Sequence, residues 1–164
     1  MTYPWYAVRV KPNFEKTAAL SLRGKGITEF LPLYRTLRRW SDRDKMTELP
    51  LFPGYLFAQF NPEIRTPVLS SPGVLGILGT GRSAIPVDAA EIDAIRNVAR
   101  EGLPCEPWPF LREGQRVRVT AGGLSGVEGI LLSLRNANHL VLQVSLLQRS
   151  VLVHIDRHHI TPVF

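Results

Sequence analysis

Cysteine is almost absent from this chain, and so are long apolar runs. The single cysteine among 164 residues is Cys105, so an internal disulfide and a metal cluster of several cysteine ligands are both excluded. No apolar run approaches the roughly 20 residues of a membrane-spanning helix, and the first residues lack the pattern of a signal peptide. These absences predict a cytoplasmic protein that does not associate with a membrane.

The motifs of common enzymes are absent as well. The chain has neither the Gly-x-Ser-x-Gly turn of a serine hydrolase nor a Gly-x-x-x-x-Gly-Lys-Ser/Thr phosphate-binding loop. His154, His158 and His159 are the best candidates for metal ligands, but their segment has a strand and turn pattern. Exposed histidines are therefore the favoured interpretation, and we expect no metal site, no cofactor and no catalytic residue.

The overall composition is that of a globular binding protein. Hydrophobic residues make up 45% of the chain and charged residues 21%, which excludes extensive disorder. The formal net charge of +6 and the pI near 10.0 favour acidic partners such as nucleic acid. A binding or structural role is therefore favoured over an enzymatic one.

The rest of the chain is organised around residues 49–60. Pro53-Gly54 predicts a β-turn, because proline fixes φ and glycine accepts a positive φ. A strand with a period of two follows, and both of its faces carry bulky apolar groups. Such a strand is either covered on both sides or presents exposed aromatic residues, which mark a partner site. One face holds Tyr55, Phe57 and Gln59, and the other holds Leu56, Ala58 and Phe60.

Local patterns predict the other elements of the N-terminal half. Aromatic and β-branched residues predict a strand over 5–10 and a second strand over 27–34, in which Pro32 indicates an edge strand or a bulge. Helical spacing predicts a helix from Phe14 to the glycines at 24 and 26, with Asn13 as its cap. A second helix is predicted to start at Asp88, which forms a capping box with Glu91.

Residues 35–48 form the most basic segment of the chain. Ser41-Asp42 is predicted to turn two short strands into a hairpin. Basic residues surround Trp40, and this combination suits a contact with nucleic acid. A solvated loop that Asp42, Asp44 and Glu48 partly neutralise explains the composition equally well, so both interpretations stay open at this point.

A proline-rich segment separates two parts of different character. Residues 103–111 contain several prolines and are predicted to be an interdomain linker. Residues 112–164 show short alternating strands, including one over 140–147, which indicate a small β-barrel. The predicted organisation is a mixed α/β domain over 1–102, the linker, and the barrel.

These motifs together resemble the NusG family of transcription factors. The resemblance rests on Leu51-Phe-Pro-Gly-Tyr-Leu-Phe57, on Ser71-Pro-Gly-Val74, and on a KOW-like segment over 114–130. It implies an α+β fold: an NGN-type α/β sandwich, mainly an antiparallel sheet with flanking helices, linked to an SH3-like KOW barrel. The phrase Pro50-Leu-Phe-Pro-Gly-Tyr-Leu-Phe57 followed by Phe60-Asn-Pro-Glu63 is closer to the specialised paralogue RfaH than to housekeeping NusG.

The resemblance implies a role on RNA polymerase during elongation. It implies that Tyr6, Tyr55 and Phe57 contact the clamp helices of the β′ subunit, and that Arg65 and Thr66 contact the gate loop of the β subunit. Bridging these two elements would favour the closed, pause-resistant enzyme by population shift. The run Arg65-Thr66-Pro67 departs from the His-Thr-Thr of RfaH.

Four basic residues match the family's approach to upstream or non-template DNA. Thr17 and Ser21 replace a basic residue and a histidine that help RfaH read its recruitment element, so recognition of that same element is not expected. The four matching residues are Lys11, Arg38, Arg39 and Arg43.

The KOW segment departs more from the family. Leu146 and Leu147 occupy the partner-binding position where housekeeping NusG has isoleucine and phenylalanine, which predicts weakened binding to Rho and retained binding to NusE. The favoured function is therefore a specialised elongation and antitermination factor. Housekeeping NusG with Rho coupling and a KOW-type RNA-binding or ribosome-associated protein are the alternatives.

Overall fold

The computed structural model describes most of the chain as two compact units. The described residues are 2–40, 43–80, 82–111, 113–134, 137–156 and 159–163. Residues 1–89 form the first unit and residues 90–164 the second. Among the described residues, no helix is long and apolar enough to cross a membrane.

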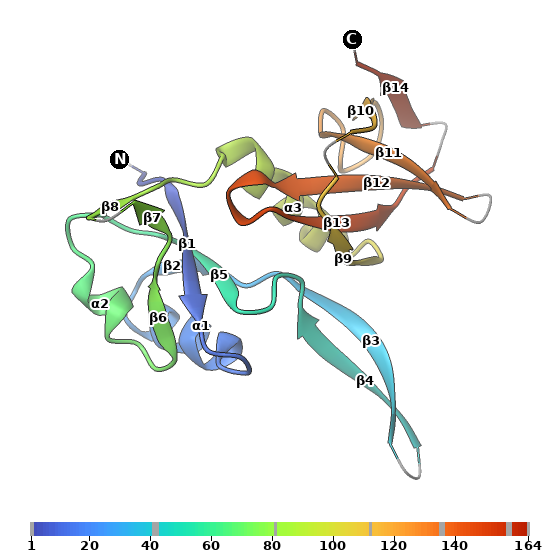
Figure 1. The fold of residues 1–164 in the computed structure, drawn as a ribbon. Helices are drawn as coiled ribbons and strands as arrows, with labels where there is room; N and C mark the ends of the chain where they lie inside the picture. Colours follow the sequence, from blue (N-terminus) through green and yellow to red (C-terminus); the bar gives the residue numbers. More distant parts are fainter. Residues whose placement is uncertain are drawn as a thin grey trace. The chain divides into compact units, whose positions relative to one another are not determined.

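The first unit is built on a four-stranded antiparallel sheet (Figure 1). Its strands run in the order β2-β5-β1-β6, so the predicted organising strand is central and pairs with β1 and β2. The elements are β1 (Trp5–Val10), α1 (Glu15–Gly24), β2 (Thr28–Phe30), β5 (Tyr55–Gln59), α2 (Thr66–Leu69), β6 (Val74–Ile77), β7 (Gly79–Thr80) and β8 (Ser83–Ala84).

One face of this sheet packs against helix α1. Alternate residues of β1 and β5 form a buried cluster with Ala18, Ala19 and Leu22 of the helix. Residues at period two share a sheet face, and burial of that face stabilises the sheet. The prediction that Leu56, Ala58 and Phe60 face the domain's own helices is therefore confirmed.

Three local predictions differ from the structure in this unit. The N-cap of α1 is Phe14 rather than Asn13, because Asn13 adopts a left-handed conformation with φ 70°. The predicted strand over 27–34 is divided at Pro32, whose carbonyl accepts a hydrogen bond from Leu51 N–H at 2.9 Å. No helix was predicted over Thr66–Leu69, where the structure has the short helix α2.

The basic segment forms the predicted hairpin. Strands β3 (Leu33–Trp40) and β4 (Arg43–Pro50) pair antiparallel along their whole length, and the hairpin extends away from the four-stranded sheet (Figure 1). The predicted turn at Ser41-Asp42 lies outside the described residues.

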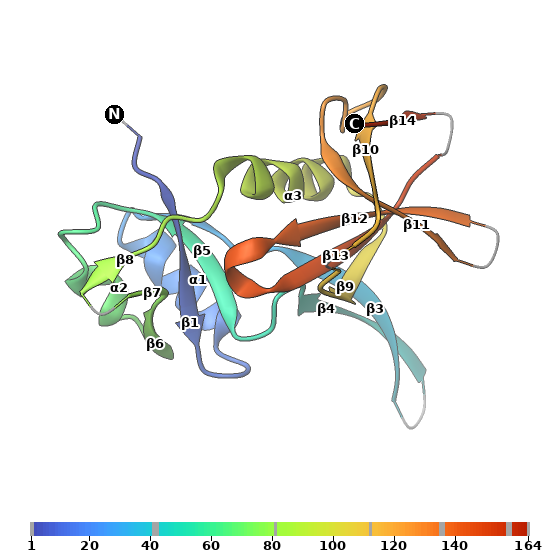
Figure 2. The same cartoon turned by 45° about the horizontal axis from the view of Figure 1, so that its top comes forward.

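The second unit is a six-stranded antiparallel sheet with one long helix. The strand order is β14-β10-β11-β12-β13-β9. Helix α3 lies beside the β12–β13 ribbon in both views (Figures 1 and 2). The elements are α3 (Ala89–Glu101), β9 (Cys105–Pro109), β10 (Gln115–Val119), β11 (Glu128–Leu134), β12 (Ala137–Val144), η1 (Ser145–Leu147), β13 (Arg149–His154) and β14 (Ile160–Pro162).

The predicted linker is part of this sheet. Residues 105–109 form the edge strand β9, which pairs with β13. Proline is tolerated in an edge strand because one side of that strand needs no ladder hydrogen bond. The domain boundary also differs from the predicted one at residue 102, because nearly all of α3 groups with the second unit.

Two glutamates of α3 contact loops of the second unit. The Glu91 carboxylate accepts hydrogen bonds from Ser145 N–H at 3.1 Å and from Ser145 Oγ at 2.6 Å. At the other end of the helix, Glu101 lies so close to Gly123 that a Cβ on this glycine would sit 2.0 Å from the carboxyl carbon. These contacts explain why the helix groups with the second unit.

Candidate functional site

The turn that begins the organising strand is held by a buried carboxylate. Gly54 has φ 85°, and Tyr55 N–H donates to the Phe52 carbonyl at 3.0 Å, as expected for a proline-glycine turn. Gly54 N–H donates to Glu15 Oε2 of α1 at 2.9 Å. The side chain of Glu15 is thus buried and satisfied by the turn, which fixes the start of β5 relative to α1.

Aromatic rings cluster on the face of the sheet opposite α1. Phe57 stacks on Phe30, with ring centres 6.3 Å apart, and meets Phe52 edge-on at 5.7 Å. Trp5 contacts Phe30 edge-on at 6.4 Å. Each such pair contributes about 0.5–1.5 kcal/mol beyond the burial of area. Phe57 is fully buried in this cluster, whereas Tyr55 is partly exposed on the same face.

Tyr6 belongs to the other face of the sheet. Its register partner is Ala58, and its ring packs on Phe60 with centres 5.1 Å apart. Tyr6 is therefore a buried member of the cluster against α1. The three residues predicted to form one clamp-contacting surface are divided, because alternation places Tyr6 opposite to Tyr55 and Phe57.

Arg65 and Thr66 lie at the start of α2 and differ in their contacts. Arg65 Nε donates to the Pro62 carbonyl at 2.8 Å, and Nη2 donates to the Arg82 carbonyl at 2.5 Å. Its guanidinium thus holds two loops of the first unit together. The side chain of Thr66 is exposed, so the two predicted gate-loop residues present different surfaces.

The two faces of the β3–β4 hairpin differ in whether acidic residues stand opposite the basic ones. On one face Arg35 pairs with Glu48 at 3.3 Å, and position 39 stands opposite Asp44. The other face has position 38 opposite Lys45 and position 40 opposite Arg43, and none of these four positions is acidic. Asp44 and Glu48 therefore do not neutralise the face that carries Arg43 and Lys45.

An exposed apolar pair lies on the face of the hairpin that carries the Arg35–Glu48 ion pair. Leu37 and Met46 are cross-strand partners, with exposed fractions of 60% and 57%. Lys11, the fourth predicted DNA-contacting residue, is exposed directly after β1.

Comparison with known proteins identifies the family of this chain. The family model described as "Transcription termination factor nusG" matches residues 3–96. The chain belongs to the NusG family. A similar curated protein is the transcription termination/antitermination protein NusG of Thermus thermophilus, which is 27% identical over 95% of this chain and 96% of that protein. The NusG of Campylobacter jejuni is 25% identical over 94% of both chains.

A solved NusG structure has a similar fold. The Thermotoga maritima structure titled "Domain interaction in Thermotoga maritima NusG" superposes with a TM-score of 0.59, at 21% identity, and covers 98% of this chain and 97% of that one. The mixed α/β fold with mostly antiparallel sheets is thus that of a NusG protein. Proteins of the NusG family are transcription factors that bind RNA polymerase.

Leu146 and Leu147 do not extend a strand in this NusG-family chain. Strand β12 ends at Val144, and Ser145–Leu147 form the 3₁₀ turn η1, closed by Gln148 in a left-handed conformation with φ 52°. Leu147 is buried and Leu146 partly exposed. Only Leu146 of the predicted partner-binding pair therefore presents surface.

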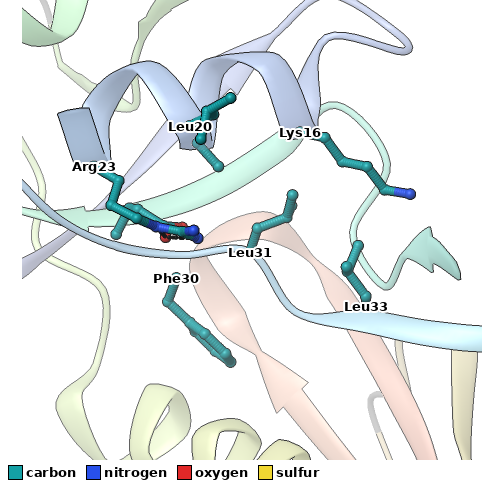
Figure 3. A pocket seen from close by; sticks show the side chains of 8 residues that line it. Lys16, Leu20, Arg23, Phe30, Leu31 and Leu33 are labelled. Atoms are coloured by element: carbon teal, nitrogen blue, oxygen red, sulfur yellow. Dashed lines mark hydrogen bonds and ion pairs between the residues drawn. The ribbon is translucent and has the colours of Figure 1, made fainter.

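A groove of the first unit was missed by the sequence analysis. It encloses about 430 Å³ between α1 and the segment that follows it (Figure 3). Two of its lining residues, Arg23 and Glu29, form an ion pair of 2.7 Å. In the sequence, Leu20 could have indicated this groove, because it lies outside the apolar spacing of α1, and in the structure it is exposed. The lining residues are Lys16, Ala19, Leu20, Arg23, Glu29, Phe30, Leu31 and Leu33.

No three or more His, Cys, Asp or Glu residues come together as metal ligands within the described ranges, and His158 lies outside those ranges. Burial raises the pKa of the Cys105 thiol above its ordinary value, and the neighbouring Glu106 carboxylate raises it further.

Proposed function

We propose that this chain is a transcription elongation and antitermination factor that binds RNA polymerase through its first unit. The observation that carries the proposal is the family match over residues 3–96, which includes the Pro53-Gly54 turn and the half-exposed Tyr55 beside it. No bond is made or broken by the factor. Stronger contact with the closed polymerase than with the open one would shift the population toward the pause-resistant state.

Tyr55 is the residue we assign to the clamp helices of the β′ subunit. It is partly exposed at the end of a strand that the Glu15–Gly54 hydrogen bond holds in position. Phe57 acts indirectly, since its ring lies between Phe30 and Phe52 under this surface. Tyr6 supports the sheet from the opposite face.

Thr66 is the residue we assign to the gate loop of the β subunit. Its side chain is exposed, and Ile64, two residues earlier, exposes 60% of its area. Arg65 holds the segment in place through the carbonyls of Pro62 and Arg82. Thr66 would therefore contact the gate loop directly, and Arg65 would position the segment that carries it.

The hairpin face with Arg43 and Lys45 is the surface we assign to upstream or non-template DNA. The register sets position 38 opposite Lys45 and position 40 opposite Arg43, and no acid stands among these four positions. Phosphate contacts from such a face release counterions, so binding would fall steeply with salt. Lys11 is a further exposed basic residue for the same DNA, whereas position 39 is paired in register with Asp44.

The second unit is the part we assign to recruitment of partners through a KOW-type surface. Leucine at 147, in place of the phenylalanine of housekeeping NusG, favours a specialised RfaH-like factor with weak Rho binding and retained NusE binding. Housekeeping NusG is the competing assignment, and the names of the curated relatives favour it. Binding of the full chain to purified Rho separates the two, since tight binding supports the housekeeping role.

The proposal is tested by binding to purified bacterial RNA polymerase. Tyr55→Ala should weaken binding by about tenfold or more, because truncation of a central aromatic anchor costs about 2 kcal/mol. Tyr3→Ala is the matched control, since Tyr3 is also an exposed tyrosine. Failure of the unmodified chain to bind the polymerase would overturn the proposal.

A further inference from the structure

Two histidines of the second unit face each other across neighbouring strands. His139 of β12 and His154 of β13 are register partners, and their ring centres are 4.5 Å apart with the ring planes inclined by 65°. The pair lies outside the surfaces assigned to polymerase, DNA and protein partners.

The backbone pattern brings these two side chains close together. Ile155 N–H donates to the Asn138 carbonyl at 3.5 Å, whereas His154 N–H donates away from β12, to the Pro104 carbonyl at 3.2 Å. His139 and His154 therefore occupy a non-hydrogen-bonded position of the ladder. At such positions the Cα atoms approach to about 4.5 Å and facing side chains contact most closely.

His139 holds a ring nitrogen that is buried without a partner. Only 5% of the residue is exposed, and no hydrogen-bond partner for its Nδ1 lies within the described residues. The register partner of His139 on the neighbouring strand β11 is Leu132, which is apolar and offers no hydrogen bond from its side chain. A neutral imidazole offers one nitrogen with a free lone pair, and this is the form that ligates a metal ion.

We propose that His139 and His154 bind a divalent transition-metal ion of the zinc type, with water completing the coordination. Imidazole nitrogens suit Zn²⁺, Ni²⁺ and Cu²⁺. Since a Zn–N bond measures about 2.0–2.1 Å, a tetrahedral ion held by one nitrogen from each ring would place the ring centres roughly 5 Å apart. The observed separation of the ring centres, 4.5 Å, is close to this value.

The ion would join the ends of β12 and β13. Neither histidine has this geometry in the unfolded chain, so the ion binds the folded state and stabilises it. Because two protein ligands leave water on the metal, we expect a dissociation constant in the micromolar range rather than that of a closed four-ligand site.

Thermal unfolding of the full chain with ZnCl₂, after removal of any purification tag, tests the proposal. Zinc at about ten times its dissociation constant should raise the unfolding midpoint by roughly 3–8 °C. His154→Phe should abolish this rise while the midpoint without metal stays close to that of the unmodified chain, because phenylalanine keeps the ring contact and removes both nitrogens.

Two matched controls separate this pair from other zinc ligands. His159→Ala removes an exposed histidine, and Cys105→Ser removes a thiol that is paired in register with Val153 and so lies on the other face of the sheet. Both variants should keep the zinc-dependent rise.

The result that overturns the proposal is a midpoint that zinc leaves unchanged up to millimolar concentration, or a rise that persists in His154→Phe. If His154→Phe does not fold, imidazole resonances of the unmodified chain provide the second measurement. Zinc must then shift the resonances of His139 and His154, and an effect confined to other histidines contradicts the site.

Discussion

Glu15 of α1 accepts a hydrogen bond from the backbone N–H of Gly54 at 2.9 Å, although the two residues are 39 positions apart in the chain. Glu15 is buried, with only 5% of the residue exposed. A buried carboxylate is costly unless hydrogen bonds satisfy it. This contact therefore fixes both the helix and the turn that starts the organising strand.

The first prediction concerns this contact. Glu15→Ala should lower the free energy of unfolding by roughly 1–3 kcal/mol, because it leaves the partly buried Gly54 N–H without its acceptor. Glu15→Gln keeps an acceptor oxygen and should lose less. Urea unfolding followed by circular dichroism measures both, and equal stability of all three proteins would refute the role of the contact.

The second prediction concerns how much Phe57 and Tyr55, on the face of β5 opposite α1, each contribute to stability. Phe57→Ala should destabilise the protein by about 3–5 kcal/mol, as expected for a fully buried ring. Tyr55→Ala should cost less than about 1 kcal/mol, because the side chain is partly exposed. Chemical unfolding of both variants tests this ranking, which fails if Tyr55→Ala is the more destabilising change.

The third prediction concerns the two faces of the hairpin. Arg43→Gln with Lys45→Gln should weaken binding to a DNA-containing elongation complex and lower the slope of log K against log salt by about 2. Arg35→Gln with Glu48→Gln removes an ion pair from the other face and is the control. If salt titrations give equal slopes for both double variants, this face of the hairpin does not contact DNA and is only a solvated surface.

The fourth prediction concerns pH and Cys105. Because burial and Glu106 raise the pKa of the folded thiol, the thiol form is favoured in the folded state. The associated stability is fully present below the unfolded pKa of about 8.5, and it is lost as pH rises from there through the raised folded pKa. Stability measured from pH 7 to pH 10 should thus fall less in Cys105→Ala than in the unmodified chain, and parallel curves would contradict this assignment.

Local patterns predicted the elements whose determinants are close in sequence. The turn at Pro53-Gly54 depends on the residues that form it, and the period of two in β5 needed no knowledge of its neighbours. The start of α3 at Ala89 directly follows the residue predicted as its cap. These features follow from backbone preference and side-chain periodicity alone.

Features that depend on distant partners were not predicted. The proline-rich segment is a strand only because β13 offers it an edge. Arg65 joins two loops only because residue 82 returns beside it. Tyr6 was grouped with Tyr55 by resemblance, whereas the register with Ala58 decides its face. Leu147 was placed in a strand, although the chain turns after Val144.

The most direct measurement of the central claim is pause escape in single-round transcription with purified bacterial RNA polymerase. The unmodified chain should shorten the lifetime of elongation pauses, Tyr3→Ala should act equally well, and Tyr55→Ala should require about tenfold more protein for the same effect. Pause lifetimes that do not change at saturating concentrations of the unmodified chain would contradict the account.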